Sequence, residues 1–364
     1  MTMLRPALDL FFPPTDDQLT FAKQIGVDDV VLFGTSLKSW AELSFKNLTA
    51  IRNRVEDAGL RLFSVETFPA HFYDQIILGK PGRTEQIRAY QEAVDNIGRA
   101  GIRHHSYNWM PTGVWRTTYS HRLRGGAKGI AFDQRDIENA PLSFDRAYSE
   151  AEFWAYYETF ITELLPVAES ANVKLSVHPN DPPIAQIGGV PQLFRSKEAF
   201  DRAMNIRPSA HHGFTFCLGG WSAMGFGETM AEVIREYGPQ GKLHYVHFQS
   251  HNTGRGSGVP QFFSENFVEL ADYKPFAVIQ ALQEVGFDGV MIPGHVPQLI
   301  GDSEWRNTYT VTDTERSPAR YTHPMGGHRS RAYAIGFMKG LITAVTYPIY
   351  TSSNRLFDGW IEQF

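Results

Sequence analysis

The chain has 364 residues, of which 42% are hydrophobic and 20% charged, and its formal net charge is -5. This is ordinary globular composition, with enough apolar material for one large domain. The basic residues are scattered, so we expect neither nucleic acid nor a membrane as a partner. A single cysteine excludes an internal disulfide and favours a reducing, cytoplasmic location. The N-terminus lacks a signal-peptide pattern, and no apolar run reaches membrane-spanning length.

Strand-like and helix-like segments alternate along the whole chain. The expected strands are Leu8–Phe12, Asp29–Phe33, Leu62–Glu66, Ile102–Tyr107, Lys174–His178, Phe214–Cys217, Leu243–His247 and Gly289–Pro293. The expected helices are Asp16–Gln24, Leu43–Ala58, Thr84–Ala100, Asp145–Ala171, Lys197–Asn205, Glu228–Tyr237, Pro275–Val285 and Arg329–Val345. Regular alternation favours parallel strands joined by helical crossovers, and this number of pairs favours closure. The sequence therefore predicts one α/β domain over residues 1–364, a (β/α)8 TIM barrel.

Three long segments interrupt this alternation and are expected to be irregular loops. They cover about 110–143 after the fourth strand, about 249–274 after the seventh and about 296–328 after the eighth. Loops of this length are usually functional, and in a barrel the loops that follow strands surround the active site.

His178, Cys217 and His247 each stand at the end of a short apolar run. Imidazole, thiolate and imidazole form a suitable ligand set for a borderline-soft divalent ion. In a closed barrel the three strand ends face one cavity, so we predict that these residues bind a metal together. Taken singly, His178 reads as a loop histidine and Cys217 as a small buried hydrophobe.

Residues near these three candidates add detail to the predicted metal site. Strand alternation places His247 and His244 on opposite faces, so only one of them is expected to point inward, and the terminal position favours His247. Gly219 and Gly220 follow Cys217 and are expected to leave room for a substrate. His295, after the last strand, suits a general acid or base, a further ligand, or a polar loop cap.

Further polar and aromatic residues near strand ends are candidates for substrate binding, although helix capping or packing explains each of them equally well. These candidates are Asn108, Trp115, Glu66, His71, Asp181 and Gln249. Four other histidines, His211, His212, His323 and His328, are expected to lie mostly on the surface or behind the site. The many aromatic side chains fit a wide pocket, an aromatic core or the interface of a homodimer.

Several sequence blocks carry a family resemblance in order along nearly the whole chain. They are Val55-Glu-Asp-Ala-Gly-Leu60, Ser64-Val-Glu-Thr67, Ala100-Gly-Ile-Arg103, Tyr107-Asn-Trp-Met-Pro111, His178-Pro-Asn-Asp-Pro-Pro183, Gly213-Phe-Thr-Phe-Cys217, Tyr245-Val-His-Phe248 and Pro293-Gly-His295. In these blocks the chain resembles the D-mannonate dehydratases, members of the xylose-isomerase-like barrel superfamily.

The resemblance implies a hydro-lyase of hexuronate catabolism that converts the sugar acid D-mannonate to 2-keto-3-deoxy-D-gluconate and water. It implies a divalent metal, typically Mn2+ with Fe2+, Co2+ or Zn2+ as other options, on His178, Cys217 and His247. It also implies a catalytic role for His295 and for a tyrosine, to which Tyr333 is the nearest match, adjacent to the aligned Ala332.

The chain departs from the family pattern at several positions. Gly294 stands where an aspartate ligand is expected, Gln249 where an arginine is expected, and Asn180 where an acid is expected. A histidine pair is missing from Phe33-Gly-Thr-Ser36, and Val114-Trp115 replaces an Asp-Trp pair. Two alternatives therefore remain open beside the dehydratase: an isomerase, epimerase or lyase acting on another sugar, and a metal-free sugar-binding protein.

Overall fold

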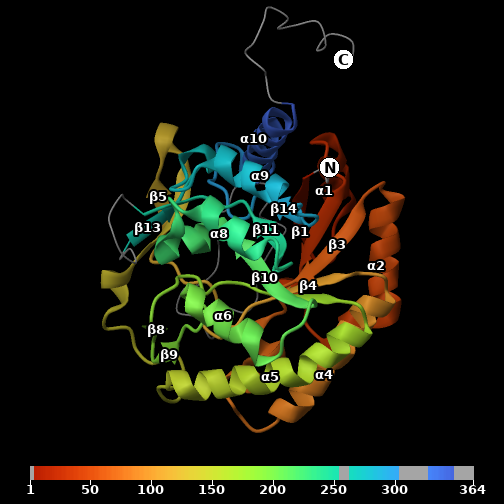
Figure 1. Ribbon diagram of the computed structural model, residues 1–364, viewed down its shortest axis with the longest axis vertical. Coiled ribbons are helices and arrows are strands. Elements are labelled where there is room, and N and C mark those ends of the chain that lie inside the picture. Colours follow the sequence, from red (N-terminus) through yellow and green to blue (C-terminus); the bar gives the residue numbers. More distant parts are fainter. Residues whose placement is uncertain (1–3, 254–261, 303–326, 348–364) are drawn as a thin grey trace, which may run out of the picture.

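The computed structural model describes residues 4–253, 262–302 and 327–347. Its centre is a closed barrel of parallel strands in the order β1-β14-β11-β10-β7-β4-β3-β2 (Figure 1). The strands are β1 (Arg5–Phe11), β2 (Asp29–Phe33), β3 (Arg61–Glu66), β4 (His104–Tyr107), β7 (Lys174–Val177), β10 (His212–Cys217), β11 (Leu243–His247) and β14 (Val290–Ile292). The predicted TIM barrel is confirmed, with half of the strand bounds as predicted and the other half shifted by one to three residues.

Helices cover the outside of the barrel (Figure 1). The longer ones are α1 (Asp16–Gln24), α2 (Phe45–Asp57), α4 (Arg83–Arg99), α5 (Glu150–Ser170), α6 (Lys197–Ile206), α8 (Met230–Tyr237), α9 (Pro275–Glu284) and α10 (His328–Thr346). Short ones are α3 (Asp74–Ile77), α7 (Leu218–Trp221), a π-helical turn Ser222–Phe226, and the 3-10 turns Gly34–Ser36, Trp40–Leu43, Ala70–Phe72, Arg124–Gly126, Gln134–Ile137 and Val268–Leu270.

The start of α5 shows how a cap fixes a boundary. We expected this helix from Asp145, but it begins at Glu150 because the Ser149 side chain accepts a hydrogen bond from the Glu152 backbone N–H. The Glu152 carboxylate in turn accepts from the Ser149 backbone, which completes a capping box.

The strands alternate between two apolar layers. Side chains such as Leu175, Phe214 and Val246 point outward into the large core between barrel and helices. A smaller cluster that includes Ala7 and Tyr245 fills the barrel interior. This period of two means that a strand-end residue on the inner face, such as His247, points into the mouth of the barrel.

Two of the three segments predicted to be irregular instead form one antiparallel sheet in the order β12-β13-β6-β5. We call this the accessory sheet: β5 (Thr118–Arg122), β6 (Lys128–Asp133), β12 (His251–Asn252) and β13 (Phe262–Glu265). The prediction was wrong because the two hairpins become one sheet only through the pairing of β6 with β13, which lie more than a hundred residues apart. A separate two-stranded ribbon joins β8 (Gln186–Ile187) to β9 (Val190–Pro191). Most of the third segment lies outside the described residues.

The prediction that His244 points away from the interior is also wrong, because β11 contains a β-bulge. Phe214 pairs with Leu243 and Thr215 with Tyr245, which leaves His244 as an extra residue. The Nδ1 atom of His244 lies 3.0 Å from the hydroxyl oxygen of Ser176 on β7. Both histidines of this strand, His244 and His247, are buried. His212 is likewise fully buried in β10 rather than at the surface.

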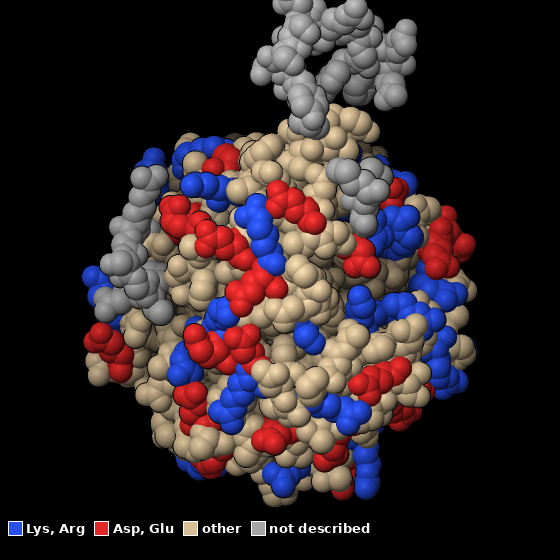
Figure 2. Space-filling model, in the orientation of Figure 1, with Lys and Arg blue, Asp and Glu red and all other residues tan. Residues whose placement is uncertain are grey.

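On the face shown in Figure 2, basic and acidic side chains are interspersed rather than gathered by sign. Of the helices that the structure describes, none has the length and apolar character needed to cross a bilayer.

Candidate metal centre and its surroundings

His178, Cys217 and His247 converge at the carboxyl ends of β7, β10 and β11. One ligand atom from each lies within 4.8 Å of the others, and all three residues are buried. The neighbouring strands bring them together: Cys217 on β10 pairs directly with His247 on β11. The structure therefore places the three predicted ligand residues in one group.

In each of the two imidazole rings, the partner of one nitrogen indicates that the other nitrogen carries the lone pair. The Nδ1–H of His178 donates to the Pro179 carbonyl oxygen at 2.7 Å, so its Nε2 carries the lone pair. The Nε2 of His247 lies 3.1 Å from a carboxylate oxygen of Glu66, outside hydrogen-bond geometry, and this contact with a carboxylate favours a proton on Nε2 and the lone pair on Nδ1. Histidine ligands in metal sites are oriented by partners of this kind.

The two lone pairs face each other. His178 Nε2 and His247 Nδ1 are 3.3 Å apart, close to the spacing of about 3.3 Å between two imidazole nitrogens bound tetrahedrally to one Zn2+ ion. Burial, reinforced by the adjacent His247, lowers the pKa of His178 to about 4, so this ring is neutral at pH 7. Two imidazole nitrogens at this separation fit a cation between them.

Glu66 lies beneath this pair and is fully buried. Burial by itself would raise the pKa of Glu66, but His247, His178 and the Tyr245 hydroxyl together outweigh burial and hold the pKa below its usual value. Its other oxygen accepts a hydrogen bond from the Tyr245 hydroxyl at 2.8 Å. Both carboxylate oxygens are therefore occupied, which favours a role in orienting His247 over direct substrate binding.

Cys217 completes the donor set. Burial raises the pKa of its thiol, and the Gly220 backbone N–H donates to Sγ at 3.4 Å. A coordinating divalent ion removes the thiol proton, so these residues fit such an ion by chemistry as well as by spacing. Gly219 and Gly220 do not open space for substrate as predicted, because added Cβ atoms would collide with His251 and Pro179.

A second group of titratable residues lies beside the first. Oxygen and nitrogen atoms of Asp181, Glu265 and His295 also fall within 4.8 Å of one another. Arg116, however, already occupies this group: it pairs with both oxygens of Asp181 at 2.7 Å and with Glu265 at 2.6 Å. The guanidinium supplies the positive charge, so this group needs no metal ion.

His295 is held from one side by Glu265, whose carboxylate accepts from His295 Nδ1 at 2.7 Å. Burial by itself would raise the pKa of Glu265. The nearby His295 and Arg116 lower this pKa by more than burial raises it, so the carboxylate stays ionised. This leaves Nε2 of His295 as its proton-accepting atom. The His295 side chain keeps 22% of its surface exposed.

Gln249 lies between the two groups. Its Nε2 donates to His251 Nε2 at 2.7 Å and lies 3.5 Å from His295 Nδ1. Its Oε1 lies 3.8 Å from Cys217 Sγ. Gln249 thus connects the metal-ligand candidates to the acid–base candidates.

The other predicted site residues have varied surroundings. Asp181 is wholly engaged with Arg116, and Trp115 is packed in a small apolar cluster with Phe132 and Phe263. Asn108 has a buried Oδ1 without a hydrogen-bond partner among the described residues, as expected of a group that meets a substrate. His71 is exposed and its ring packs on Phe72.

Tyr333 is not joined to either group. Its hydroxyl donates to Glu269 at 2.6 Å and accepts from Arg124 at 3.2 Å, and 41% of the residue is exposed. Its catalytic role stays a prediction, without support from its hydrogen bonds. His328 begins α10, and His323 lies outside the described residues.

Sequence reasoning missed the residues that support the site from a distance. Arg116, Glu265 and His251 come from the accessory sheet and its approaches, which we predicted to be irregular. Asp9 on β1 and Arg331 on α10 form a buried ion pair. The isolated acid at Glu265 carried no local signal, since only the pairing of β13 with β6 brings it to the site.

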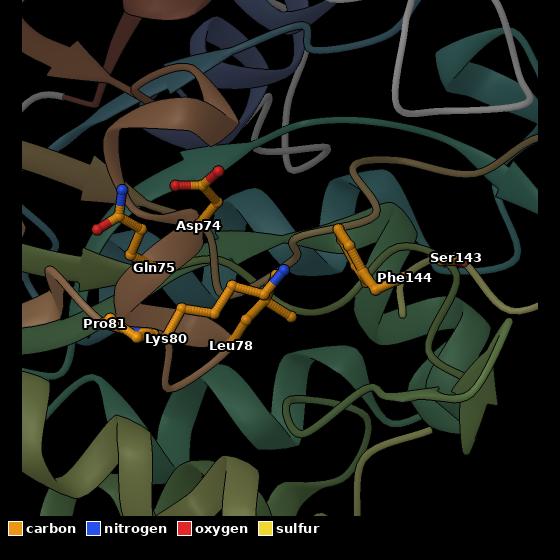
Figure 3. A pocket seen from close by; sticks show the side chains of 7 residues that line it. All are labelled: Asp74, Gln75, Leu78, Lys80, Pro81, Ser143 and Phe144. Atoms are coloured by element: carbon orange, nitrogen blue, oxygen red, sulfur yellow. The ribbon is translucent and has the colours of Figure 1, made fainter. Parts of the chain in front are cut away.

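A separate surface hollow of about 590 Å³ lies beside α3, lined by Asp74, Gln75, Lys80 and Phe144 among others (Figure 3). None of the residues that line it belongs to the two groups described above, so it is distinct from the candidate metal centre.

The fold and the group of His178, Cys217 and His247 define a TIM-barrel protein with a candidate divalent-metal site at the carboxyl ends of its strands. Comparison with known proteins narrows this class. The family model described as D-mannonate dehydratase (UxuA) matches residues 13–147 and 140–346. The chain therefore belongs to the D-mannonate dehydratase family.

Individual proteins similar to this chain are mannonate dehydratases, in agreement with the family model. "Mannonate dehydratase 2" of Halalkalibacterium halodurans is 28% identical over 321 residues, covering 80% of this chain and 90% of that protein. The mannonate dehydratase of Streptococcus pneumoniae is 29% identical over 296 residues, covering 74% of this chain and 78% of its own. The crystal structure of mannonate dehydratase from Streptococcus suis serotype 2 superposes with a TM-score of 0.80 at 25% identity, over 95% of this chain and 94% of that one.

A D-psicose 3-epimerase structure, at 10% identity and a TM-score of 0.56 over 93% of this chain and 99% of that one, shares the fold. Together with a xylose isomerase domain protein from Planctomyces limnophilus, at 11% identity and a TM-score of 0.56 over 94% and 99% of the two chains, it confirms the xylose-isomerase-like architecture.

Proposed function

We propose that this protein is a metal-dependent sugar-acid dehydratase, with D-mannonate as substrate and 2-keto-3-deoxy-D-gluconate and water as products. The observation that carries the proposal is the facing pair of imidazole lone pairs beside Cys217, in a chain of the D-mannonate dehydratase family. We further propose that the protein acts in the cytoplasm.

The chemistry explains why an ion is needed. The proton on C2 of an aldonic acid is weakly acidic because it lies next to a carboxylate. His178, Cys217 and His247 would hold a divalent ion, which would supply Lewis-acid stabilisation of negative charge on the substrate carboxylate and the adjacent hydroxyl. We propose Mn2+ as this ion, with Fe2+, Co2+ or Zn2+ as substitutes.

Residues of the chain carry out the proton transfers and bind the substrate. We assign His295 Nε2 as the atom that takes up or releases a proton, because Glu265 holds Nδ1 protonated. Loss of the C3 hydroxyl requires a proton donor, and His295 is the partly exposed candidate. Asn108 is proposed to bond a substrate hydroxyl through its unpartnered Oδ1.

The test is turnover of D-mannonate by purified protein loaded with Mn2+, followed by a keto-acid assay. We expect a 2-keto-3-deoxy acid, and no product after chelation of the ion. As a matched pair, His178→Ala should abolish turnover, whereas His211→Ala at the opposite end of the barrel should keep it. Absence of product with Mn2+, Co2+ and Zn2+ alike would reject D-mannonate as substrate.

A second candidate is an isomerase or epimerase acting on a neutral sugar. Gln249 stands where an arginine was expected, and the two buried arginines described near the barrel mouth are already paired, Arg116 with Asp181 and Glu265, and Arg331 with Asp9. A substrate carboxylate therefore finds few unpaired cations among the described residues. A panel of ketoses without carboxylates, assayed for interconversion, distinguishes the two reactions.

A further inference from the structure

The side chain of Gln249 faces the candidate metal ligands with its oxygen rather than its nitrogen. Its Nε2 donates to His251 Nε2 at 2.7 Å, which fixes the orientation of the amide. Oε1 points toward Cys217 Sγ, 3.8 Å away, and accepts a long hydrogen bond from the His295 backbone N–H at 3.5 Å. Gln249 is 2% exposed, so bulk water does not solvate this oxygen.

The separation of the oxygen and sulfur atoms is informative. Two donors bound to one tetrahedral ion, a sulfur at about 2.3 Å and an oxygen at about 2.1 Å, lie about 3.6 Å apart. The observed 3.8 Å between Cys217 Sγ and Gln249 Oε1 is close to this spacing. Without an ion, the protonated Cys217 thiol donates to this amide oxygen, and an ion that displaces the thiol proton would lie between the same two atoms.

Gly294 explains why the amide fits there. A Cβ atom at position 294 would lie 3.1 Å from Gln249 Oε1 and 3.7 Å from His247 Cβ. Any longer side chain at 294 would compete with Gln249 for this space. The backbone φ of Gly294 is +65°, a region that glycine adopts freely and that aspartate tolerates better than most residues.

We propose that Gln249 supplies an amide oxygen as the fourth protein ligand of the divalent ion. The amide oxygen thereby takes the ligand position that an aspartate at 294 was expected to fill and that Gly294 leaves without a side chain. The protein donor set is then two neutral imidazoles, one thiolate and one neutral amide, with a protein charge of one minus. Because a neutral oxygen replaces an anionic one, the bound ion keeps more of its positive charge for the substrate.

This inference rests on the proposed function only in requiring that an ion binds, and it does not depend on the substrate. The experiment therefore measures metal binding without turnover. Co2+ is titrated into metal-free protein in competition with a chromogenic chelator, and the visible absorption of the bound Co2+ reports its donor atoms.

Three variants are compared with the native protein. Gln249→Met keeps the side-chain length but removes the oxygen, and we expect affinity to fall by about 100-fold and the Co2+ bands to shift. Gln249→Glu supplies an anionic oxygen, and we expect affinity at least equal to the native value, with shifted bands. Gln240→Glu adds the same charge on the exposed surface, and neither quantity should change.

An exchange of positions completes the test. Gln249→Ala alone should bind Co2+ weakly, and combining it with Gly294→Asp should restore affinity because the carboxylate then occupies the space left by the amide. Thermal unfolding of each metal-free variant shows whether the fold is kept, and Gln249→Glu supplies the comparison if Gln249→Met unfolds.

The outcomes separate the two proposals. If the native protein binds no stoichiometric ion, the proposed function fails. If the native protein binds Co2+ and Gln249→Met or Gln249→Glu binds it with unchanged affinity and unchanged absorption, the assignment of Gln249 is overturned while the proposed function stands.

Discussion

Two groups of three potential ligands lie side by side in this protein, and they differ in what balances their charge. In the group of His178, Cys217 and His247, lone pairs face each other across 3.3 Å with no protein cation between them. In the group of Asp181, Glu265 and His295, the guanidinium of Arg116 pairs with both carboxylates.

The difference shows that proximity of donors alone does not define a metal site. The second group has more negative charge, yet its charge is already compensated within the chain. The first group is nearly neutral, but the directions of its donor atoms call for an ion. Whether a side chain of the protein already supplies the cation therefore separates a metal site from a buried salt-bridge network.

The largest expected effect comes from removing a ligand of the first group. His178→Ala should lower Mn2+ affinity by more than about 100-fold, since even partners behind the ligands cost about 10–100-fold. Elemental analysis after gel filtration measures the bound ion. Retention of one ion per chain in this variant would contradict the assignment, and His211→Ala is the matched control.

Removing the internal cation should affect stability more than metal binding. Arg116→Met leaves the Asp181 and Glu265 carboxylates buried without a partner, at a cost of about 3–5 kcal/mol in the free energy of unfolding. Urea denaturation of metal-free protein measures the change. Arg54→Met removes a surface pair with Asp16 and should leave the unfolding midpoint near native. Equal midpoints for the two variants would show that the buried network contributes little.

A smaller effect should follow from weakening the support of His295. In Glu265→Gln the neutral amide no longer holds Nδ1 protonated, and we expect kcat to fall by about 10–100-fold with KM nearly unchanged. Steady-state kinetics with the physiological substrate measures both constants. Glu269→Gln, in the same part of the chain but hydrogen-bonded to Tyr333, is the control. A rise in KM without a change in kcat would assign Glu265 to substrate binding instead.

The smallest effect is expected for Tyr333→Phe. Its hydroxyl bonds only Glu269 and Arg124 among the described residues, so we expect kcat within about twofold of native, as for ordinary surface substitutions. The same kinetic assay applies. A drop of about 100-fold would restore the catalytic role that the family resemblance suggested.

The sequence predicted the barrel well because its signals are local. Apolar runs, caps and alternation placed β2, β11 and α1 at their observed bounds, and the ends of β7, β10 and β11 indicated His178, Cys217 and His247. In a parallel barrel the strand ends necessarily meet, so residues at those ends could be grouped without any coordinates.

The remainder of the site depends on contacts that no local pattern encodes. The accessory sheet pairs β6 with β13, and only that pairing brings Glu265 to Arg116 and His295. The inward turn of His244 depends on one unpaired residue in β11, which simple alternation cannot anticipate. The orientation of the Gln249 amide depends on His251, a residue that sequence reasoning did not single out.

The accessory sheet has a practical consequence for engineering. Its strands arise from loops inserted after β4 and β11, and they contribute Glu265 but none of the three proposed barrel ligands. Directed-evolution libraries confined to these hairpins, with His251 and Glu265 kept, should therefore change which sugar acid the protein accepts while cation uptake persists.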